Sequence, residues 1–261
     1  MGFAVSLISA MFRRMFASAG LRPGSAVVDD DGTTLHFWAH SSLLILPSKN
    51  GAAAAAAAAG RRPVVVLVHG FGPDPTWQWG AQVGPLSRHF DLVEVGKVVL
   101  CDADLAKGAE DDAALAAKGG VAEVTELMAP ADGKAFRRLM ALCVHRPPKY
   151  IPVFLVRDLL RKYFADKREE KIRLIKEIVT EEQDSQLNSP LPQEILIIWG
   201  EFDQIFPVEK AHKVKEMLGE KATVKIIPNT GHLAHQEDPK MFNDILLKFL
   251  LPSPAVANGA K

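Results

Sequence analysis

Four short apolar runs are spaced along the chain, at 64–68, 98–101, 195–199 and 224–227, the last of which contains Lys225. A strand built from such a run is apolar on both faces, which is typical of a parallel strand buried between layers of helices. A weaker run at 35–39 predicts one further, early strand. Helical patterns separate the runs. This alternation of strand and helix predicts an α/β protein with a mostly parallel sheet.

Residues 107–190 interrupt the alternation. Three prolines, Pro147, Pro148 and Pro152, precede a charged stretch in which Ile172 and Ile175 lie at helical spacing. That spacing predicts an amphipathic helix with one buried stripe, and we expect the segment to form a helical cap over one edge of the sheet. The predicted organisation is an N-terminal segment at 1–20, a first core part at 21–106 with an alanine-rich solvated loop at 51–60, the cap at 107–190, a second core part at 191–251 and a disordered tail at 252–261.

The first 20 residues have a helical pattern of their own. Five apolar side chains can share one face of a helix: Phe3, Leu7, Met11, Met15 and Phe16. This pattern predicts an amphipathic helix that packs on the domain. Residues 1–28 contain no acidic side chain and three arginines, so an organelle-targeting segment and a membrane-surface contact by residues 1–19 stay open as alternatives.

Composition narrows the function classes. The chain has 261 residues, with 31 basic and 31 acidic side chains, and this neutral balance argues against nucleic-acid binding. Two cysteines without a C-x-x-C pair indicate neither a disulfide framework nor a metal site. No apolar run approaches the roughly 20 residues of a membrane span, so we expect a soluble, cytoplasmic protein. The oligomeric state is not indicated.

Candidate chemistry follows three of the predicted strands. His69, Gly70, Phe71 and Gly72 follow the first run, with Trp77 and Trp79 shortly after; Asp203 follows the third run and His232 the fourth. The carboxyl ends of parallel strands meet at one edge of a sheet, so these residues are expected to converge. A carboxylate there can orient an imidazole and stabilise its protonated form. Free N–H groups of a glycine-rich turn can stabilise an oxyanion.

In this order and spacing, the three segments resemble the α/β-hydrolase superfamily, nearest its monoacylglycerol-lipase-like and epoxide-hydrolase-like branch in plants. The resemblance covers most of residues 21–250. It implies that Asp203 is the acid, that His232 is the base and that Gly70 and Phe71 offer oxyanion N–H groups. It further implies substrate contacts by His69, Gly72, Trp77 and Trp79, a small apolar ester or lipid-like substrate, and no cofactor or metal.

The nucleophile of that superfamily is missing. It lies in a G-x-S-x-G elbow, and no serine, cysteine or aspartate of this chain has glycines two residues before and after it. Only residues 94–96 separate two apolar stretches that would be different strands, whereas a parallel crossover needs a dozen or more residues. We therefore predict one strand over about 92–101, reached from 64–68 through a helix at 77–90. At least one central strand, its elbow and its helix are absent.

Cys101 ends a strand at the correct edge, but an apolar strand raises a thiol pKa and makes it a poor substitute nucleophile. Three functions remain: an active ester hydrolase, a non-catalytic pseudoenzyme that binds a small molecule or partner, and an inactive shortened form of an active hydrolase. Loss of one contiguous block between intact motifs favours the shortened form. The binding pseudoenzyme is the alternative.

Overall fold

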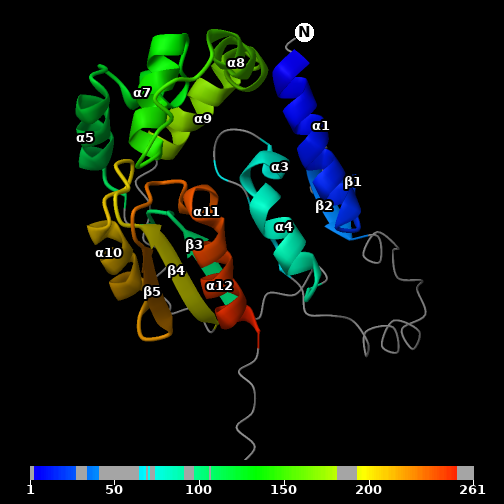
Figure 1. Cartoon of the computed structure of the whole chain (residues 1–261). Coiled ribbons are helices and arrows are strands. Elements are labelled where there is room, and N and C mark those ends of the chain that lie inside the picture. The colour runs from blue at the N-terminus through cyan, green and yellow to red at the C-terminus, as the bar shows by residue number, and fades with distance from the viewer. Residues whose placement is uncertain are drawn as a thin grey trace, which may run out of the picture. The chain divides into compact units, whose positions relative to one another are not determined.

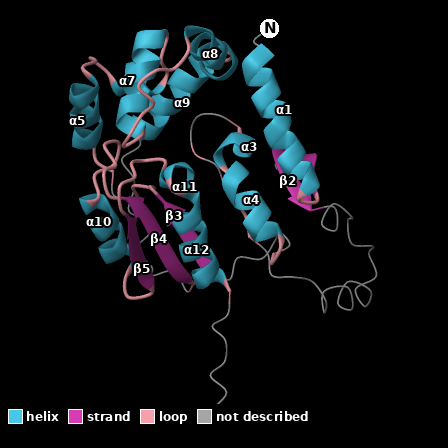
Figure 2. Cartoon of the chain, viewed as in Figure 1, coloured by secondary structure: helices cyan, strands magenta, loops and turns pink. Residues whose placement is uncertain are grey.

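A computed structural model describes most of the chain (Figures 1 and 2). The described residues are 3–27, 34–40, 65–68, 70, 74–90, 97–105, 107–180 and 193–251. The chain divides into two compact units. One, here called the N-terminal unit, comprises 1–96 and 152–163; the other, the sheet unit, comprises 97–151 and 164–261. The domain boundaries expected from the sequence stay a prediction, and the loop at 51–60 and the tail at 252–261 lie outside the described residues.

The sheet unit contains a three-stranded parallel sheet in the order β3-β4-β5. Its strands are β3 (Lys97–Cys101), β4 (Glu194–Gly200) and β5 (Ala222–Ile227). Three of the four apolar runs are therefore confirmed as parallel strands. The central strand, β4, is the most deeply buried, since four consecutive core positions in it are almost inaccessible to solvent: Ile195, Leu196, Ile197 and Ile198.

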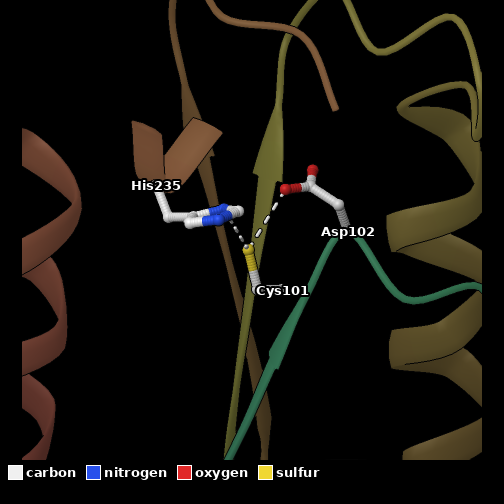
Figure 3. A group of neighbouring side chains, drawn as sticks. All are labelled: Cys101, Asp102 and His235. Carbon is white, nitrogen blue, oxygen red and sulfur yellow. Dashed lines mark hydrogen bonds between the residues drawn. The ribbon is translucent and has the colours of Figure 1, made fainter. Parts of the chain in front are cut away.

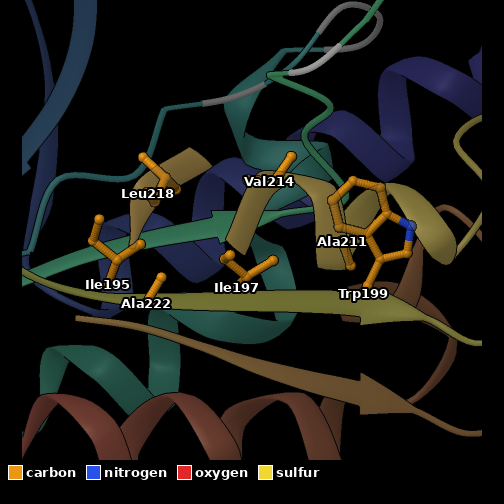
Figure 4. Close-up of a cluster of buried hydrophobic side chains, with 7 residues drawn as sticks. All are labelled: Ile195, Ile197, Trp199, Ala211, Val214, Leu218 and Ala222. Carbon is orange, nitrogen blue, oxygen red and sulfur yellow. The ribbon is translucent and has the colours of Figure 1, made fainter. Parts of the chain in front are cut away.

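Helices cover both faces of this sheet. Helix α10 (Glu209–Leu218) packs Ala211, Val214 and Leu218 onto one face of β4 and β5, where they meet Trp199 (Figure 4). Helix α12 (Pro239–Leu250) follows the short α11 (Ala234–Glu237) and lies on the opposite side of the sheet (Figure 1). This layered arrangement buries both faces of the central strand β4, as its unbroken apolar run requires, while Thr223 and Lys225 of β5 stay exposed.

Residues 107–180 are largely helical, as predicted. The helices of this segment in the sheet unit lie beyond the carboxyl ends of the strands (Figure 1): α5 (Ala109–Gly119), α6 (Val124–Met128), α7 (Gly133–Cys143) and α9 (Arg168–Thr180). Within α9, Ile175 is buried, in line with the predicted stripe. Helix α8 (Val153–Leu159) belongs to the N-terminal unit, and a π-helical turn, η2 (Leu160–Ala165), spans the boundary.

The N-terminal unit combines helices with an antiparallel hairpin. Its elements are α1 (Phe3–Ser18), β1 (Leu21–Val27), β2 (Thr34–His40), α3 (Pro75–Gln78), α4 (Gly80–Ser87) and α8. The predicted helix at 77–90 is present, broken at Trp79. The predicted strand at 35–39 is β2, but its partner β1 was not predicted, because it contains Pro23 and Gly24. Gly24 fits here because a Cβ would lie 2.7 Å from the facing Phe37 ring.

The expected strand at 64–68 is wrong over the described residues. Residues 65–68 form no strand, and Val66 and Val68 are 54% and 79% exposed. A strand forms only when a neighbour accepts its backbone hydrogen bonds, and no described strand pairs with this segment. The single βαβ unit predicted from 64–68 to 101 therefore does not form, and β3 begins at Lys97, with 91–96 outside the described residues.

The predicted buried face of α1 is wrong at three of its five positions. Leu7, Met11 and Met15 are 60%, 52% and 40% exposed, whereas Phe16 is buried as predicted, together with Val5, which was not predicted. Polar Ser9 lies on the buried face instead, where its hydroxyl accepts from the indole Nε1 of Trp77 (3.0 Å) and hydrogen-bonds the hydroxyl of Tyr163 (3.2 Å). These hydrogen bonds favour the observed rotation of the helix, and apolar periodicity does not encode them. Among the described helices, including α1, none is long and apolar enough to cross a membrane.

Candidate functional site

The loops that follow β4 and β5 are joined by backbone hydrogen bonds. Glu201 N–H donates to Ile227 C=O (3.0 Å) and Phe202 N–H to Thr230 C=O (2.8 Å). The approach is so close that a Cβ on Gly200 would lie 2.0 Å from the carbonyl oxygen of Gly231. Glycine is therefore required at position 200, where the two loops turn toward each other.

This junction brings Asp203 and His232 together. His232 Nδ1 lies 2.9 Å from Asp203 Oδ2, and the Asp203 side chain is fully buried. The other carboxylate oxygen, Oδ1, accepts the backbone N–H groups of Ile205 (2.8 Å) and Phe206 (3.0 Å). One carboxylate thus shapes its own loop and holds the imidazole. An ionised carboxylate accepts a proton donor at Nδ1, which leaves Nε2 of His232 as the basic nitrogen.

The surroundings of His232 favour its protonated form. Burial acts to lower the pKa of His232, but the hydrogen bond and negative charge of Asp203 outweigh it, and the pKa is raised above its ordinary 6.5. The ring edge of Phe206 packs against the imidazole at 5.4 Å between ring centroids. The pair is therefore preorganised for proton transfer, and the acid and base roles of the two residues stay predictions.

Glu237 fixes the loop that carries His232, through contacts that the sequence did not reveal. Its Oε1 accepts the N–H of Gly231 (2.8 Å) and its Oε2 the N–H of His145 (2.9 Å). The His145 ring stacks on Phe202 at 4.2 Å. Glu237 thereby joins the His232 loop to the segment that follows α7. Its only signal in the sequence is its position five residues after His232.

A second group of side chains lies at the same edge of the sheet (Figure 3). The Cys101 thiol donates to Asp102 Oδ2 (3.1 Å) and lies 3.9 Å from His235 Nδ1. Burial, together with the charges of Asp102 and Asp203, raises the pKa of Cys101. Burial also raises the pKa of Asp102 to about 7 and lowers that of His235 to about 4. The expectation that Cys101 is a poor nucleophile agrees with these surroundings.

Asp104, two residues after Asp102, forms an ion pair with Lys210. Its Oδ2 lies 3.1 Å from Lys210 Nζ, which also contacts Asp111. This ion-pair cluster fastens the loop after β3 to α10. A buried carboxylate that already holds a lysine is not available to orient a histidine.

The residues expected to bind the oxyanion and substrate belong to the N-terminal unit. Gly70 N–H donates to the side-chain oxygen of Gln78 (3.1 Å), and Gly70 C=O accepts from the same amide (3.2 Å). Trp77 packs on Phe12 and Tyr163, and Trp79 on the cluster around Phe16. His69, Phe71 and Gly72 lie outside the described residues. The oxyanion and substrate roles of these residues therefore stay predictions.

No family model and no curated protein match the chain. Solved structures do. A membrane phospholipase A, described as a bacterial virulence factor, gives a TM-score of 0.66 at 16% identity, over 94% of this chain and 91% of that chain. A protein described as a lipase from Acinetobacter baumannii AYE gives 0.61 at 15% identity, over 93% and 95%.

A meta-cleavage product hydrolase from Pseudomonas fluorescens IP01 gives a TM-score of 0.53 at 16% identity, over 73% of this chain and 91% of that chain. At identities this low, the likeness concerns the fold. The chain thus has the α/β-hydrolase fold, with a parallel sheet and cap helices beyond its carboxyl edge, as the sequence resemblance implied. The finer assignment to a plant lipase-like or epoxide-hydrolase-like branch stays a prediction.

Proposed function

We propose that this protein is an ester- or lipid-hydrolase-type chain that keeps the acid and base, Asp203 and His232, but has lost the nucleophile and is catalytically inactive. One observation carries the proposal: the 2.9 Å Asp203–His232 pair is assembled, while no G-x-S-x-G elbow exists anywhere in the sequence. A base without a nucleophile within hydrogen-bond reach cannot start acyl transfer.

Nearby residues do not supply a replacement. The hydroxyl of Thr230, two residues before the base, donates to Ile227 C=O at 2.9 Å and is buried. The thiol of Cys101 faces His235 and Asp102, and its pKa is raised by burial and two negative charges. Both groups are therefore held in contacts that work against attack on a carbonyl carbon.

The substrate class of the intact form is proposed from the similar structures. The two with the highest TM-scores given above are described as a phospholipase A and a lipase, which supports a small apolar ester or lipid-like substrate. Residual rate enhancement from oxyanion donors alone is known in triad knockouts, so activity must be measured against a matched control.

The activity test uses the full chain and His232→Ala. We expect no labelling by a fluorophosphonate probe and no turnover of a p-nitrophenyl ester beyond that of the variant. A parent chain that is labelled, or that hydrolyses the ester faster than His232→Ala, would show that a nucleophile is present and would overturn the proposal.

The shortened-form proposal has a separate test. Sequencing of transcripts across codons 92–97 is expected to find a longer form with an insertion that encodes the elbow and its flanking strand and helix. If every transcript matches this sequence, and the purified protein shows a cooperative thermal transition, then the chain is a stable protein in its own right and not a shortened product.

A second candidate, a non-catalytic binding protein, rests on an apolar hollow in the N-terminal unit. Its lining includes Leu21, Val65, Leu67, Val83 and Phe90. Its volume is about 30 Å³, well below the roughly 300–1,000 Å³ of a small-molecule site, so an apolar ligand must enlarge it on binding. Screening a library of lipids and esters by thermal shift would detect such a ligand, because a ligand that binds the folded state raises the melting temperature. Absence of any shift would exclude this candidate for the classes screened.

A further inference from the structure

Cys101, Asp102 and His235 present three different metal-binding atoms to one point (Figure 3). The Cys101 sulfur, an Asp102 carboxylate oxygen and a His235 ring nitrogen all lie within 4.8 Å of one another. Asp102 and His235 are each 5% exposed, and Cys101 is partly buried. The three side chains come from the end of β3 and from α11, elements that are far apart in the sequence.

The separations suit tetrahedral coordination by zinc. Bond lengths of about 2.3 Å to sulfur and about 2.0–2.2 Å to nitrogen or oxygen place neighbouring ligand atoms about 3.6 Å apart. Cys101 Sγ lies 3.1 Å from Asp102 Oδ2 and 3.9 Å from His235 Nδ1. These two values lie within about half an ångström of the ideal, and all three ligand atoms lie within 4.8 Å of one another, so the ligands must draw together to complete the site.

The Asp102 carboxylate is oriented by an unusual backbone conformation and by a hydrogen bond to Gly200. Asp102 has a φ of 46°, in the left-handed region that L-residues seldom adopt. Its Oδ1 accepts the buried N–H of Gly200 at 2.9 Å, which fixes the carboxylate and aims Oδ2 at the thiol. On the other side, the His235 ring packs edge-on against Phe242, with 5.9 Å between centroids.

The local charges favour a cation over a nucleophilic thiolate. Cys101 lies in the negative field of Asp102 and Asp203, which opposes a bare thiolate. A bound dication removes this penalty on the thiolate. The two carboxylates attract the dication, and the dication stabilises the thiolate directly. The cluster that makes Cys101 a poor nucleophile is therefore well suited to a soft or borderline divalent metal ion.

We propose that Cys101, Asp102 and His235 form a binding site for a divalent transition-metal ion of the zinc type, which fastens the end of the edge strand β3 to α11. Binding displaces the Cys101 thiol proton to solvent, and the ion takes the thiolate, the carboxylate and the neutral imidazole as ligands. The fourth tetrahedral position is left for water. The site departs from the sequence expectation of no metal, which rested on the missing C-x-x-C pair, and it is independent of the proposed loss of hydrolase activity.

The first test needs no substitution. The full chain, freed of metal with a chelator, is titrated with Zn²⁺ and treated with a thiol-alkylating reagent. We expect one ion to bind per chain and to slow alkylation of Cys101 by at least about 10-fold, while alkylation of Cys143 is unchanged. Equal alkylation of Cys101 with and without Zn²⁺ would overturn the site.

The second test uses Co²⁺ as a spectroscopic substitute. The parent chain should develop a thiolate-to-cobalt charge-transfer band in the near ultraviolet. Cys101→Ser should abolish the band, and Asp102→Asn and His235→Gln should each weaken binding at least about 10-fold. The matched control Cys143→Ser should keep both band and affinity. Circular dichroism of each variant separates lost binding from lost folding.

A third variant separates this site from the neighbouring acid–base pair. His232→Gln is expected to bind Zn²⁺ as the parent does. If His232→Gln loses the ion while Cys101→Ser retains it, the metal belongs to the Asp203–His232 pair, and the proposed site is wrong. If the parent chain shows no saturable binding, the proposal also fails.

Discussion

At the scale of single residues, Gly200 is the position where the site is most sensitive to one added carbon. A Cβ there would lie 2.0 Å from the carbonyl oxygen of Gly231, and both partners are backbone. We expect Gly200→Ala to lower the free energy of unfolding by at least about 3 kcal/mol, measured by urea denaturation. Gly84→Ala is the matched control, because nothing lies within 4 Å of its Cβ and α4 gains helix propensity there, worth about 0.5–1 kcal/mol. Equal effects of the two substitutions would contradict the close approach.

The Asp203–His232 pair makes a second prediction at this scale. The pKa of His232 is raised by Asp203 against the effect of burial. In Asp203→Asn that charge is gone, so the pKa of His232 should fall, as followed by NMR titration of the imidazole. A raised pKa in the folded state adds stability below the ordinary value near 6.5, and that stability is lost as the pH rises through the folded pKa. The parent chain should therefore lose this contribution on alkalinisation and Asp203→Asn should not; an unchanged His232 pKa in the variant would contradict the assignment.

The two kinds of site residue differ in how far the sequence reveals them. Asp203 and His232 could be predicted to meet because each follows an apolar strand and one helix separates those strands. The contacts of Asp102 with Gly200 and of Cys101 with His235 could not, since they depend on a left-handed backbone at Asp102 and on the direction in which α11 leaves its loop. Spacing along strands predicts which loops converge, but not which side chains turn toward one another within them.

At the scale of elements, substitutions in helix α1 test whether the face buried in the structure or the face predicted from apolar spacing supports stability. Val5 is 1% exposed and Leu7 is 60% exposed, the reverse of what the apolar spacing predicts. We expect Val5→Ala to destabilise the N-terminal unit by about 2 kcal/mol, and Leu7→Ala to change its stability by less than about 0.5 kcal/mol. Tryptophan fluorescence during urea denaturation would measure the stability of this unit, since three of the four tryptophans (Trp38, Trp77 and Trp79) lie in it. A larger loss for Leu7→Ala would restore the face expected from the sequence.

Elements of the sheet unit could be predicted from sequence far better than those of the N-terminal unit. The apolar runs of β3, β4 and β5 form strands that pair with one another, so pattern and structure agree, although β5 also carries the exposed Thr223 and Lys225. Residues 65–68 have an equally strong pattern yet form no strand. A run of β-branched residues is a strand only where a neighbour completes its hydrogen bonds, and the sequence predicts that a central strand and its connections are missing.

At the scale of the whole molecule, we expect β3 to be open to pairing with another chain, because the strand predicted to be missing would lie beside it. Within the described residues, β3 pairs with β4 alone. Asp102 N–H donates to Ile198 C=O of β4, and alternate residues of a strand point the same way. The backbone groups of Leu100 and Val98 therefore face β4, and those of Val99 face the other edge. Unpaired groups of this kind template association between sheets.

This parity gives a matched pair of proline substitutions. Val99→Pro removes an N–H from the unpaired edge and leaves the ladder to β4 intact, which an edge strand tolerates. Leu100→Pro removes a donor from the ladder and should cost at least about 2 kcal/mol of unfolding free energy. We expect the parent chain to self-associate as its concentration rises, measured by size-exclusion chromatography with light scattering, and Val99→Pro to associate less while retaining most of its stability. If Val99→Pro associates as readily as the parent, the contact between chains lies elsewhere than at β3; if it unfolds as Leu100→Pro does, the edge at Val99 is already paired.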